Sequence, residues 1–170
     1  MDKRWSVWLV PCESDRIHLQ KLIKDYCARF NSPVFEPHLT LFGRVETDPV
    51  FTLPFFNNLV KDTAPTSLKV TSVKTGIPPW KALFPQMENN KELIQFQREI
   101  DLYFKGYRPY KFEPHLSLAY GNFAINKFEL DNISFPETIT FSSVALGTTP
   151  DEITDWKIIN RLNLGERASP

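Results

Sequence analysis

Net charge, cysteine and histidine are all scarce in this sequence. Twenty lysines and arginines balance twenty aspartates and glutamates among 170 residues, so the formal net charge is zero. Proteins that bind long nucleic acids along the backbone usually carry a basic excess or a basic stripe. Neither is visible in this sequence. The charge balance therefore favours a small phosphate ligand, and we expect no long nucleic acid as partner.

The two cysteines do not form a recognisable metal-binding pattern. Cys12 and Cys27 lack the C-x-x-C spacing, and no second cluster of cysteine and histidine accompanies them. We expect both to be reduced thiols in a cytoplasmic protein. The sequence thus gives no reason to expect a metal, and we predict that no cofactor is needed.

Long hydrophobic runs are also missing. The apolar stretch at residues 5–10 is short and is interrupted by Ser6. A membrane-spanning helix needs about 20 apolar residues, and a signal peptide needs a continuous apolar region after its charged start. We therefore expect no membrane contact and a cytoplasmic location, and we expect the protein to be a monomer.

The composition is otherwise that of a globular protein, with 42% hydrophobic and 24% charged residues. The length fits one domain over residues 1–170. Hydrophobic periodicity predicts strands and helices in a mixed order, which favours an α+β fold with antiparallel sheets. The expected strands are 5–10, 38–45, 67–76, 80–87, 115–121, 141–147 and 157–164; the expected helices are 14–30 with Ser14 as N-cap, 50–60 and 88–104.

One heptapeptide occurs twice. Residues 35–41 read Phe-Glu-Pro-His-Leu-Thr-Leu, and residues 112–118 read Phe-Glu-Pro-His-Leu-Ser-Leu. Six positions are identical, and the seventh exchanges one hydroxyl residue for another. Each copy follows a predicted long helix. The repeat therefore predicts two βαβ-like halves related by a pseudo-twofold axis.

Strand geometry gives the repeat a chemical meaning. Side chains two residues apart on a strand share a face, so His38 and Thr40 should point one way while the leucines enter the core. His115 and Ser117 should do the same in the second copy. If the two strands lie side by side about a twofold axis, two imidazoles and two hydroxyls face one cleft.

These four groups suit the opening of a cyclic phosphodiester. The reaction needs a base that takes a proton from water and, on the opposite side of phosphorus, an acid that protonates the leaving oxygen. His38 and His115 can fill either role because the unperturbed pKa of histidine lies near neutrality. Thr40 and Ser117 can donate hydrogen bonds to the phosphate oxygens.

A single His-x-Ser/Thr match would be a weak motif, whereas two matches inside one repeated heptapeptide are specific. The competing interpretation is a duplicated scaffold that has lost activity. The third histidine, His18, lies among polar residues of the first predicted helix, and we expect it to be a solvated surface residue.

With these motifs, the sequence resembles the two-histidine (2H) phosphoesterases, and within them the cyclic phosphodiesterases of the plant and yeast type. The resemblance rests on the two motifs, on the opening strand at residues 6–11, on the tract 74–84 and on the closing segment 153–164. It implies a bilobal fold, with two antiparallel sheets related by a pseudo-twofold axis, helices packed outside them and a central cleft between the lobes. It also implies hydrolysis of ADP-ribose 1″,2″-cyclic phosphate and of nucleoside 2′,3′-cyclic phosphates, the latter to 2′-phosphates, in the metabolism of RNA and tRNA splicing.

Three further residues are candidates for the site. Tyr120 matches a family tyrosine near the phosphate, although strand alternation puts it on the face opposite His115 unless the strand bends. Trp80 and Phe84 share one face of the predicted hairpin and could stack on a base or line the cleft. Packing in the core is an equally good explanation for all three. Here Pro78-Pro79 also replaces the more continuous aromatic run of the family.

Two other functions remain open. One is a 2′-5′ RNA ligase-like protein or an RNA 3′-end phosphodiesterase of the same superfamily, for which the neutral charge balance is unfavourable. The other is a non-catalytic module that binds a nucleotide without cleaving it, against which the intact histidines in both copies argue.

Overall fold

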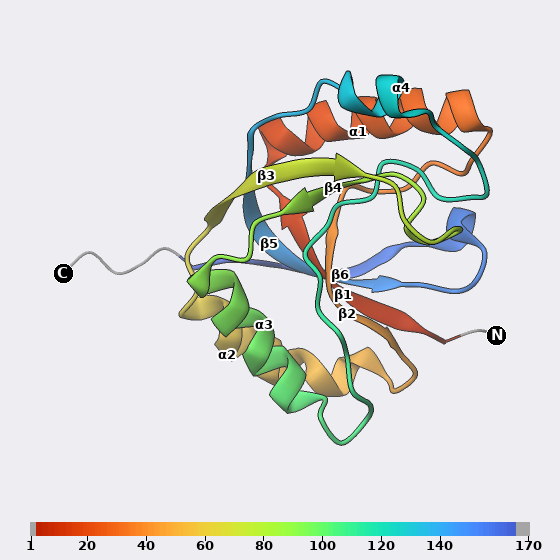
Figure 1. The fold of residues 1–170 in the computed structure, drawn as a ribbon. Helices are drawn as coiled ribbons and strands as arrows, with labels where there is room; N and C mark the ends of the chain where they lie inside the picture. The colour runs from red at the N-terminus through yellow and green to blue at the C-terminus, as the bar shows by residue number, and fades with distance from the viewer. Residues whose placement is uncertain (1–2, 166–170) are drawn as a thin grey trace.

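The computed structural model describes residues 3–165, and Figure 1 shows their arrangement. The strands are β1 (Trp5–Pro11), β2 (Leu39–Val45), β3 (Thr66–Lys74), β4 (Phe84–Met87), β5 (Thr138–Thr148) and β6 (Ile158–Asn163). The α-helices are α1 (Glu13–Phe30), α2 (Leu53–Lys61), α3 (Lys91–Tyr103) and α4 (Lys127–Asp131), and two short 3₁₀ helices are η1 (Pro49–Thr52) and η2 (Ile153–Asp155).

All strand pairs are antiparallel. The long strand β5 connects two groups of strands, because it pairs with members of both. The sheet runs in the order β2-β1-β5-β3-β4, with β6 also paired to β5. One half of β5 pairs with β1 and β6, and its beginning pairs with β3. One lobe is therefore β2-β1-β5-β6 and the other is built on β3 and β4. The predicted α+β, bilobal architecture is confirmed.

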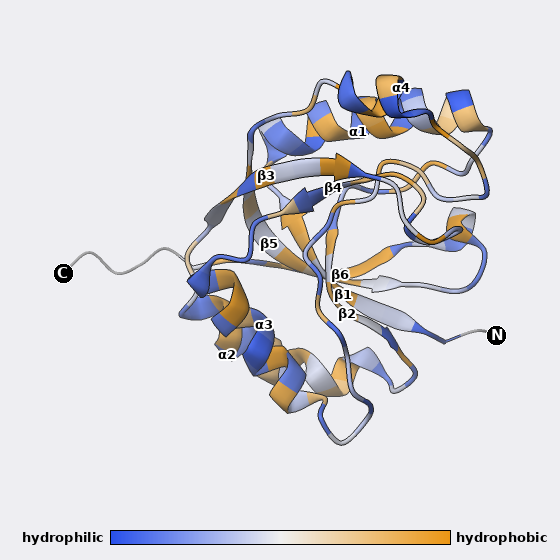
Figure 2. Ribbon diagram, viewed as in Figure 1, coloured by the Kyte–Doolittle hydropathy of each residue, from blue (hydrophilic) through white to orange (hydrophobic). Residues whose placement is uncertain are grey.

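The helices lie in two pairs on opposite sides of the sheet (Figure 1). An ion pair between Arg29 and Glu129, 2.6 Å long, links α1 to α4. Phe55 of α2 stacks on Tyr103 of α3 with ring centroids 4.0 Å apart. Orange and blue alternate along these helices in Figure 2, as expected of helices that bury one face.

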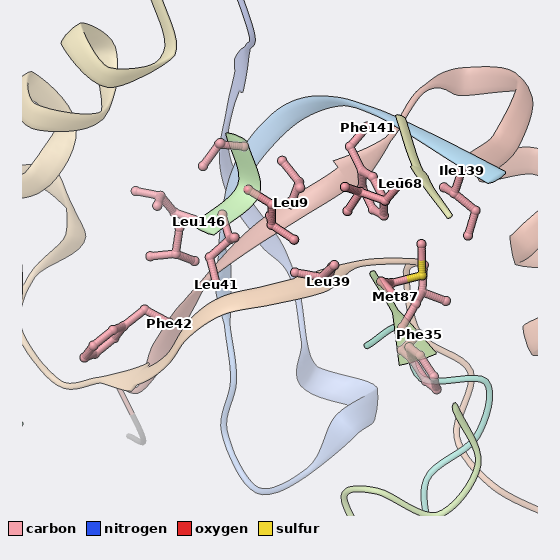
Figure 3. Close-up of a cluster of buried hydrophobic side chains, with 14 of the residues drawn as sticks. Leu9, Phe35, Leu39, Leu41, Phe42, Leu68, Met87, Ile139, Phe141 and Leu146 are labelled. Carbon is pink, nitrogen blue, oxygen red and sulfur yellow. The ribbon is translucent and has the colours of Figure 1, made fainter. Parts of the chain in front are cut away.

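The core lies between the sheet and the helices, and Figure 3 shows part of it. Leu39 and Leu41 of β2 are fully buried beside Leu9 of β1, as strand alternation predicts for the leucines of the first motif. Burial of several such side chains, each contributing about 1.5–3 kcal/mol, fixes which face of β2 points away from the core.

The structure corrects three local predictions. Ser14 is not the N-cap of the first helix; Cys12 occupies that position without a side-chain cap, and acidic Glu13 and Asp15 stabilise the first turn instead. The predicted strand 80–87 is regular only from Phe84, because a turn occupies 78–81. The short helix α4, which begins at the N-cap Asn126, was not predicted.

The predicted strand 115–121 is also wrong as a regular strand, because only isolated bridges form along it. The amides of Leu116 and Leu118 donate to the carbonyls of Pro85 and Leu83, in and just before β4. Pro85 has no N–H to donate in return, although the amide of Met87 donates to the carbonyl of Pro114, so the pairing stays irregular. The segment 115–119 runs beside β4 but is free to bend.

Both cysteines are free thiols, with Cys27 buried and Cys12 half-buried. His18 is exposed on α1, as expected. Within residues 3–165, the structure contains no helix of the length and apolar character that crossing a bilayer requires.

Candidate active site

The two copies of the heptapeptide meet at one point. Leu39 and Leu116, the leucines that follow the two histidines, form an antiparallel bridge and are both fully buried. In antiparallel pairing, the residue before one partner lies across from the residue after the other. His38 therefore lies across from Ser117, and His115 lies across from Thr40. The leucine pair marks a local pseudo-twofold axis, and all four polar residues occupy the face opposite the leucines.

The same hydrogen bond orients both imidazoles. Nδ1 of His38 donates to the carbonyl oxygen of Glu36, and Nδ1 of His115 donates to that of Glu113, each at 2.7 Å. A carbonyl can only accept, so Nδ1 carries the proton in both rings. The tripeptide Glu-Pro-His thus fixes the tautomer in each copy and leaves Nε2 as the reactive nitrogen.

An aromatic side chain from the neighbouring strand packs on His38. Trp8 of β1 pairs with Thr40 in the sheet, and its indole stacks on the imidazole with centroids 4.2 Å apart and planes at 21°. Small residues of β5 make room for this indole. A Cβ placed on Gly147 would overlap the ring carbons of Trp8, and Ala145 lies directly opposite Trp8.

The surroundings of His115 are more polar than those of His38. Phe84 of β4 contacts it edge to face, with centroids 5.2 Å apart. The carboxylate of Glu113 forms ion pairs with Lys81 and with Lys111. These two ammonium groups on one carboxylate hold the pKa of Glu113 at about 2. The cluster Lys81–Glu113–Lys111 therefore places more positive than negative charge beside His115.

Both histidines are neutral at pH 7 in the free protein. Burial lowers the pKa of His38 to about 4, against the opposing effect of its bond to the Glu36 carbonyl, and His115 lowers it further. Burial also lowers the pKa of His115, while Lys81 lowers and Glu113 raises it. Each ring consequently presents an unprotonated Nε2.

The two histidines line a cavity of about 210 Å³. Of the residues predicted for the site, it also brings in Thr40, Tyr120 and Trp80. Tyr120 is therefore on the side of His115 rather than opposite it, because the irregular segment 115–119 does not keep strand alternation. The remaining lining residues are Ser6, Trp8, Gly43, Arg44, Lys81, Tyr110, Thr149 and Trp156.

Two predicted residues lie just outside this lining. Ser117 is buried, and its side chain hydrogen-bonds to Tyr120, which does line the cavity. Burial raises the pKa of the Tyr120 hydroxyl, so it stays protonated and can donate. Phe84 is buried behind His115 and does not reach the cavity surface.

Trp80 stands at the edge of the cavity in an aromatic group. Its ring is nearly parallel to that of Trp156, with an interplanar angle of 14° and centroids 6.3 Å apart. Tyr120 contacts both rings edge-on. Trp80 is 39% exposed, so part of its indole is available to a ligand.

Sequence reasoning missed several lining residues. Trp8 could have been found by pairing the first two strands, since Ser6 and Trp8 alternate onto the face that β2 uses for Thr40. Trp156 and Lys81 come from the ends of irregular segments. No local sequence pattern predicts that these two residues line the cavity. Arg44 follows a break in strand alternation, because its φ of 58° is left-handed.

Two comparisons, with family models and with solved structures, found proteins similar to this chain. Residues 3–79, a little under half of the chain, match the family model for cyclic phosphodiesterase-like proteins. No curated protein matches the sequence.

Solved structures match nearly the whole chain. The protein TT0787 of Thermus thermophilus has a TM-score of 0.70 at 16% identity, with 96% of this chain and 100% of that chain covered. Escherichia coli LigT complexed with 3′-AMP has a TM-score of 0.66 at 14% identity, with 96% and 99% covered. A structure described as a phosphoesterase has a TM-score of 0.67 at 13% identity, with 98% and 100% covered. The match over residues 3–79 makes the first part of the chain similar to cyclic phosphodiesterase-like proteins, and the solved structures share its fold over nearly the whole chain.

Proposed function

We propose that this protein is a metal-independent cyclic phosphodiesterase in which His38 and His115 are the acid–base pair. The observation that carries the proposal is the shared Nδ1–H bond to a backbone carbonyl, which leaves two Nε2 atoms available in one cavity. A duplicated scaffold without activity would have no need to keep both rings in the same tautomer.

In the proposed reaction, one neutral imidazole takes a proton from water through Nε2 as the water oxygen bonds to phosphorus. The bond from phosphorus to one ribose oxygen breaks in line with this attack. The other histidine, protonated when the anionic substrate binds, gives its Nε2 proton to that oxygen. The product is a ring-opened phosphate monoester, and proton exchange with solvent restores the pair.

Neighbouring groups would stabilise the charge on the phosphate oxygens. Thr40 and Tyr120 line the cavity with hydroxyl donors, and Ser117 supports Tyr120 through their hydrogen bond. The Lys81 ammonium adds positive charge beside His115. We assign Trp80 to contact with the base or ribose, and Phe84 to holding the His115 ring from behind.

For the substrate we propose small cyclic phosphates, namely ADP-ribose 1″,2″-cyclic phosphate and nucleoside 2′,3′-cyclic phosphates, the latter opened to 2′-phosphates. The cavity of about 210 Å³ suits part of a nucleotide rather than a polymer. E. coli LigT, which shares the fold, has been crystallised with 3′-AMP, ATP and NADP⁺, all small nucleotides.

Replacing either histidine tests the proposal. His38→Gln and His115→Gln keep side-chain size and an N–H donor but remove the titratable nitrogen. Because a general acid or base contributes about 10²–10⁴-fold to the rate, we expect kcat to fall by that factor in each variant. The measurement is turnover of ADP-ribose cyclic phosphate and of the four 2′,3′-cyclic nucleotides with a chelator present, with each product's regiochemistry assigned by phosphorus NMR.

The exposed third histidine provides the matched control. His18→Gln should leave turnover unchanged because His18 lies on the surface of α1. Full activity in either cleft variant would contradict the acid–base assignment. Binding of a cyclic nucleotide by the unaltered protein without any product would instead identify a non-catalytic binding module.

One observation favours a second candidate, an RNA 3′-end phosphodiesterase or a 2′-5′ RNA ligase-like enzyme. Although the chain is neutral overall, positive charge gathers beside the cavity at Lys81 and Lys111, which share one carboxylate. Such charge could also attract an RNA backbone. RNA oligomers that end in a cyclic phosphate, offered in competition with ADP-ribose cyclic phosphate, distinguish the two candidates by their kcat/KM.

A further inference from the structure

Arg44 is held in an unusual backbone conformation beside the cavity. Its φ of 58° lies in the left-handed region, which non-glycine residues seldom adopt. Its amide N–H donates to Oγ of Ser6 at 2.9 Å. The Ser6 hydroxyl in turn forms a hydrogen bond with the Thr149 hydroxyl, also at 2.9 Å. These buried hydroxyls hold the conformation in place and set the direction in which the side chain leaves β2.

The guanidinium of Arg44 lies on the cavity rim between an aromatic ring and a carboxylate. It covers the ring of Trp80, with Cζ 5.4 Å from the centroid, and it contacts Asp151 at 2.5 Å. Asp151 also binds Arg4, at 2.9 Å. Two guanidinium groups thus share one carboxylate, so Asp151 does not fully neutralise Arg44.

The contact between Arg44 and Asp151 is easily exchanged. The side chain of Asp151 is 69% exposed and that of Arg44 is 38% exposed, so water screens the pair. Exposed ion pairs of this kind contribute little to stability. A phosphate can take two parallel N–H bonds from the same guanidinium, a geometry that arginine favours. Arg44 can therefore bind an anion at little cost to the fold.

Arg44 is not among the charged groups that shift the pKa of either histidine. The charged groups that shift the pKa of His115 are Lys81 and Glu113, and the one that shifts the pKa of His38 is His115. Arg44 and Tyr120 both contact the indole of Trp80, which Tyr120 meets edge-on with ring centroids 5.9 Å apart. An anion at Arg44 would accordingly lie beside Trp80 in the same cavity as a phosphate held between the histidines.

We propose that Arg44 binds a second phosphate of the substrate, esterified to the 5′ oxygen of the ribose that carries the cyclic phosphate. This inference rests on the proposed function, because it assumes that the first phosphate occupies the histidine pair. The diphosphate of ADP-ribose 1″,2″-cyclic phosphate supplies such a group, and so does the last phosphodiester of an RNA chain that ends in a 2′,3′-cyclic phosphate. Arg44 would make the enzyme prefer either of these to a simple nucleoside cyclic phosphate.

A binding experiment tests the proposal without relying on turnover. Isothermal titration calorimetry compares adenosine 2′,5′-bisphosphate with adenosine 2′-monophosphate. The unaltered protein should bind the bisphosphate at least about tenfold more tightly, since a charge-assisted phosphate contact is worth that factor or more. Arg44→Met should abolish this preference while leaving the affinity for the monophosphate largely intact. No preference in the unaltered protein, or the same preference in the variant, would overturn the proposal.

Two further variants separate phosphate binding from structural effects. Arg4→Met removes the same charge from a residue outside the cavity lining; because Asp151 then pairs with Arg44 alone, the preference should weaken but persist. Arg44→Asn also removes the guanidinium but accepts the left-handed conformation readily, so its loss of preference would not come from backbone strain. If Arg4→Met lost the preference equally, Arg44 would be only part of a general charge effect and the proposal would fail.

Kinetics then identify the source of the second phosphate. The substrates are uridine 2′,3′-cyclic phosphate, its 5′-phosphorylated form, ADP-ribose 1″,2″-cyclic phosphate and a dinucleotide ending in a cyclic phosphate. Arg44→Met should raise KM at least about tenfold for those with a 5′-phosphate group, and the substrate with the largest rise indicates the physiological class. Equal losses on all four would overturn the proposal. Absence of turnover on all four by the unaltered protein would refute the proposed function alone, because the binding preference stands on its own measurement.

Discussion

At the scale of single residues, the repeated tripeptide Glu-Pro-His explains most of the candidate site. The sequence repeat predicted His38, Thr40, His115 and Ser117 on one face, and the pairing of Leu39 with Leu116 agrees with that arrangement. The hydrogen bond that fixes each imidazole tautomer was not predictable, because it depends on the direction of a backbone carbonyl two residues earlier. Neither was the position of Tyr120, because the segment before it pairs with β4 and β2 only through isolated bridges.

The pKa values of the two histidines predict an acidic optimum for the free enzyme. The rate needs one neutral and one protonated imidazole, so kcat/KM should be bell-shaped in pH. With the pKa of His38 at about 4 and that of His115 below 6.5, activity should rise through pH 4 and fall again before pH 6.5 is passed. Initial rates at substrate concentrations far below KM, measured from about pH 3.5 to 8, give this profile. A plateau extending above pH 7 would show that burial does not lower the pKa of His115.

At the scale of elements, hydrophobic periodicity located the regular strands and long helices but not the irregular parts. The sequence pattern reveals strands β1, β2, β5 and β6, because their apolar side chains either alternate or form a continuous buried run. Helix α4 has five residues, too few for a helical pattern to appear. The segment 115–119 has the residues of a strand, yet its regularity depends on the donors of its neighbour β4.

Packing between β1 and β5 leads to a prediction for Gly147. Gly147→Ala would place a Cβ within the indole of Trp8, so Trp8 must shift, and with it the ring stacked on His38. We expect a loss of about 1–3 kcal/mol in the free energy of unfolding from overpacking, together with a reduced kcat. Urea unfolding followed by tryptophan fluorescence measures the first and steady-state kinetics the second.

Gly43, which lines the cavity, is the matched control for this substitution. A Cβ on Gly43 would meet its nearest atoms at 3.7 Å, an ordinary contact. Gly43→Ala should therefore leave unfolding nearly unchanged. Equal stability of both alanine variants would mean that Gly147 is not needed to seat Trp8.

At the scale of the whole molecule, the neutral charge balance hides an uneven distribution. Lys81–Glu113–Lys111 and Arg4–Asp151–Arg44 each combine two cations with one carboxylate, and a member of each lines the cavity. Net charge was a correct observation about the sequence, but it could not reveal where the charges gather. Strand order was equally out of reach, because β1 pairs with β5 from the far end of the chain.

This distribution predicts a mild salt dependence. Two small clusters bring their cations to the cavity, and the chain as a whole is balanced. We expect kcat/KM for ADP-ribose cyclic phosphate to fall by roughly twofold to fivefold between about 50 and 500 mM salt. Enzymes that follow an RNA backbone lose far more, since each neutralised phosphate releases counterions. A fall of about a hundredfold or more would favour the RNA 3′-end candidate.

Each imidazole is held by a backbone carbonyl, and this affects the electrostatic potential that an approaching anion meets. Many catalytic histidines donate a hydrogen bond from Nδ1 to a carboxylate. The carboxylate orients the ring but places a full negative charge close to the reacting atoms. Here Glu36 and Glu113 offer their peptide oxygens to the rings, and the Glu113 side chain is neutralised by two lysines. The dipoles of two peptide carbonyls, and not charged carboxylates, orient the two imidazoles. Under the proposed function, an anionic substrate would approach two imidazoles whose Nδ1 partners carry no full negative charge.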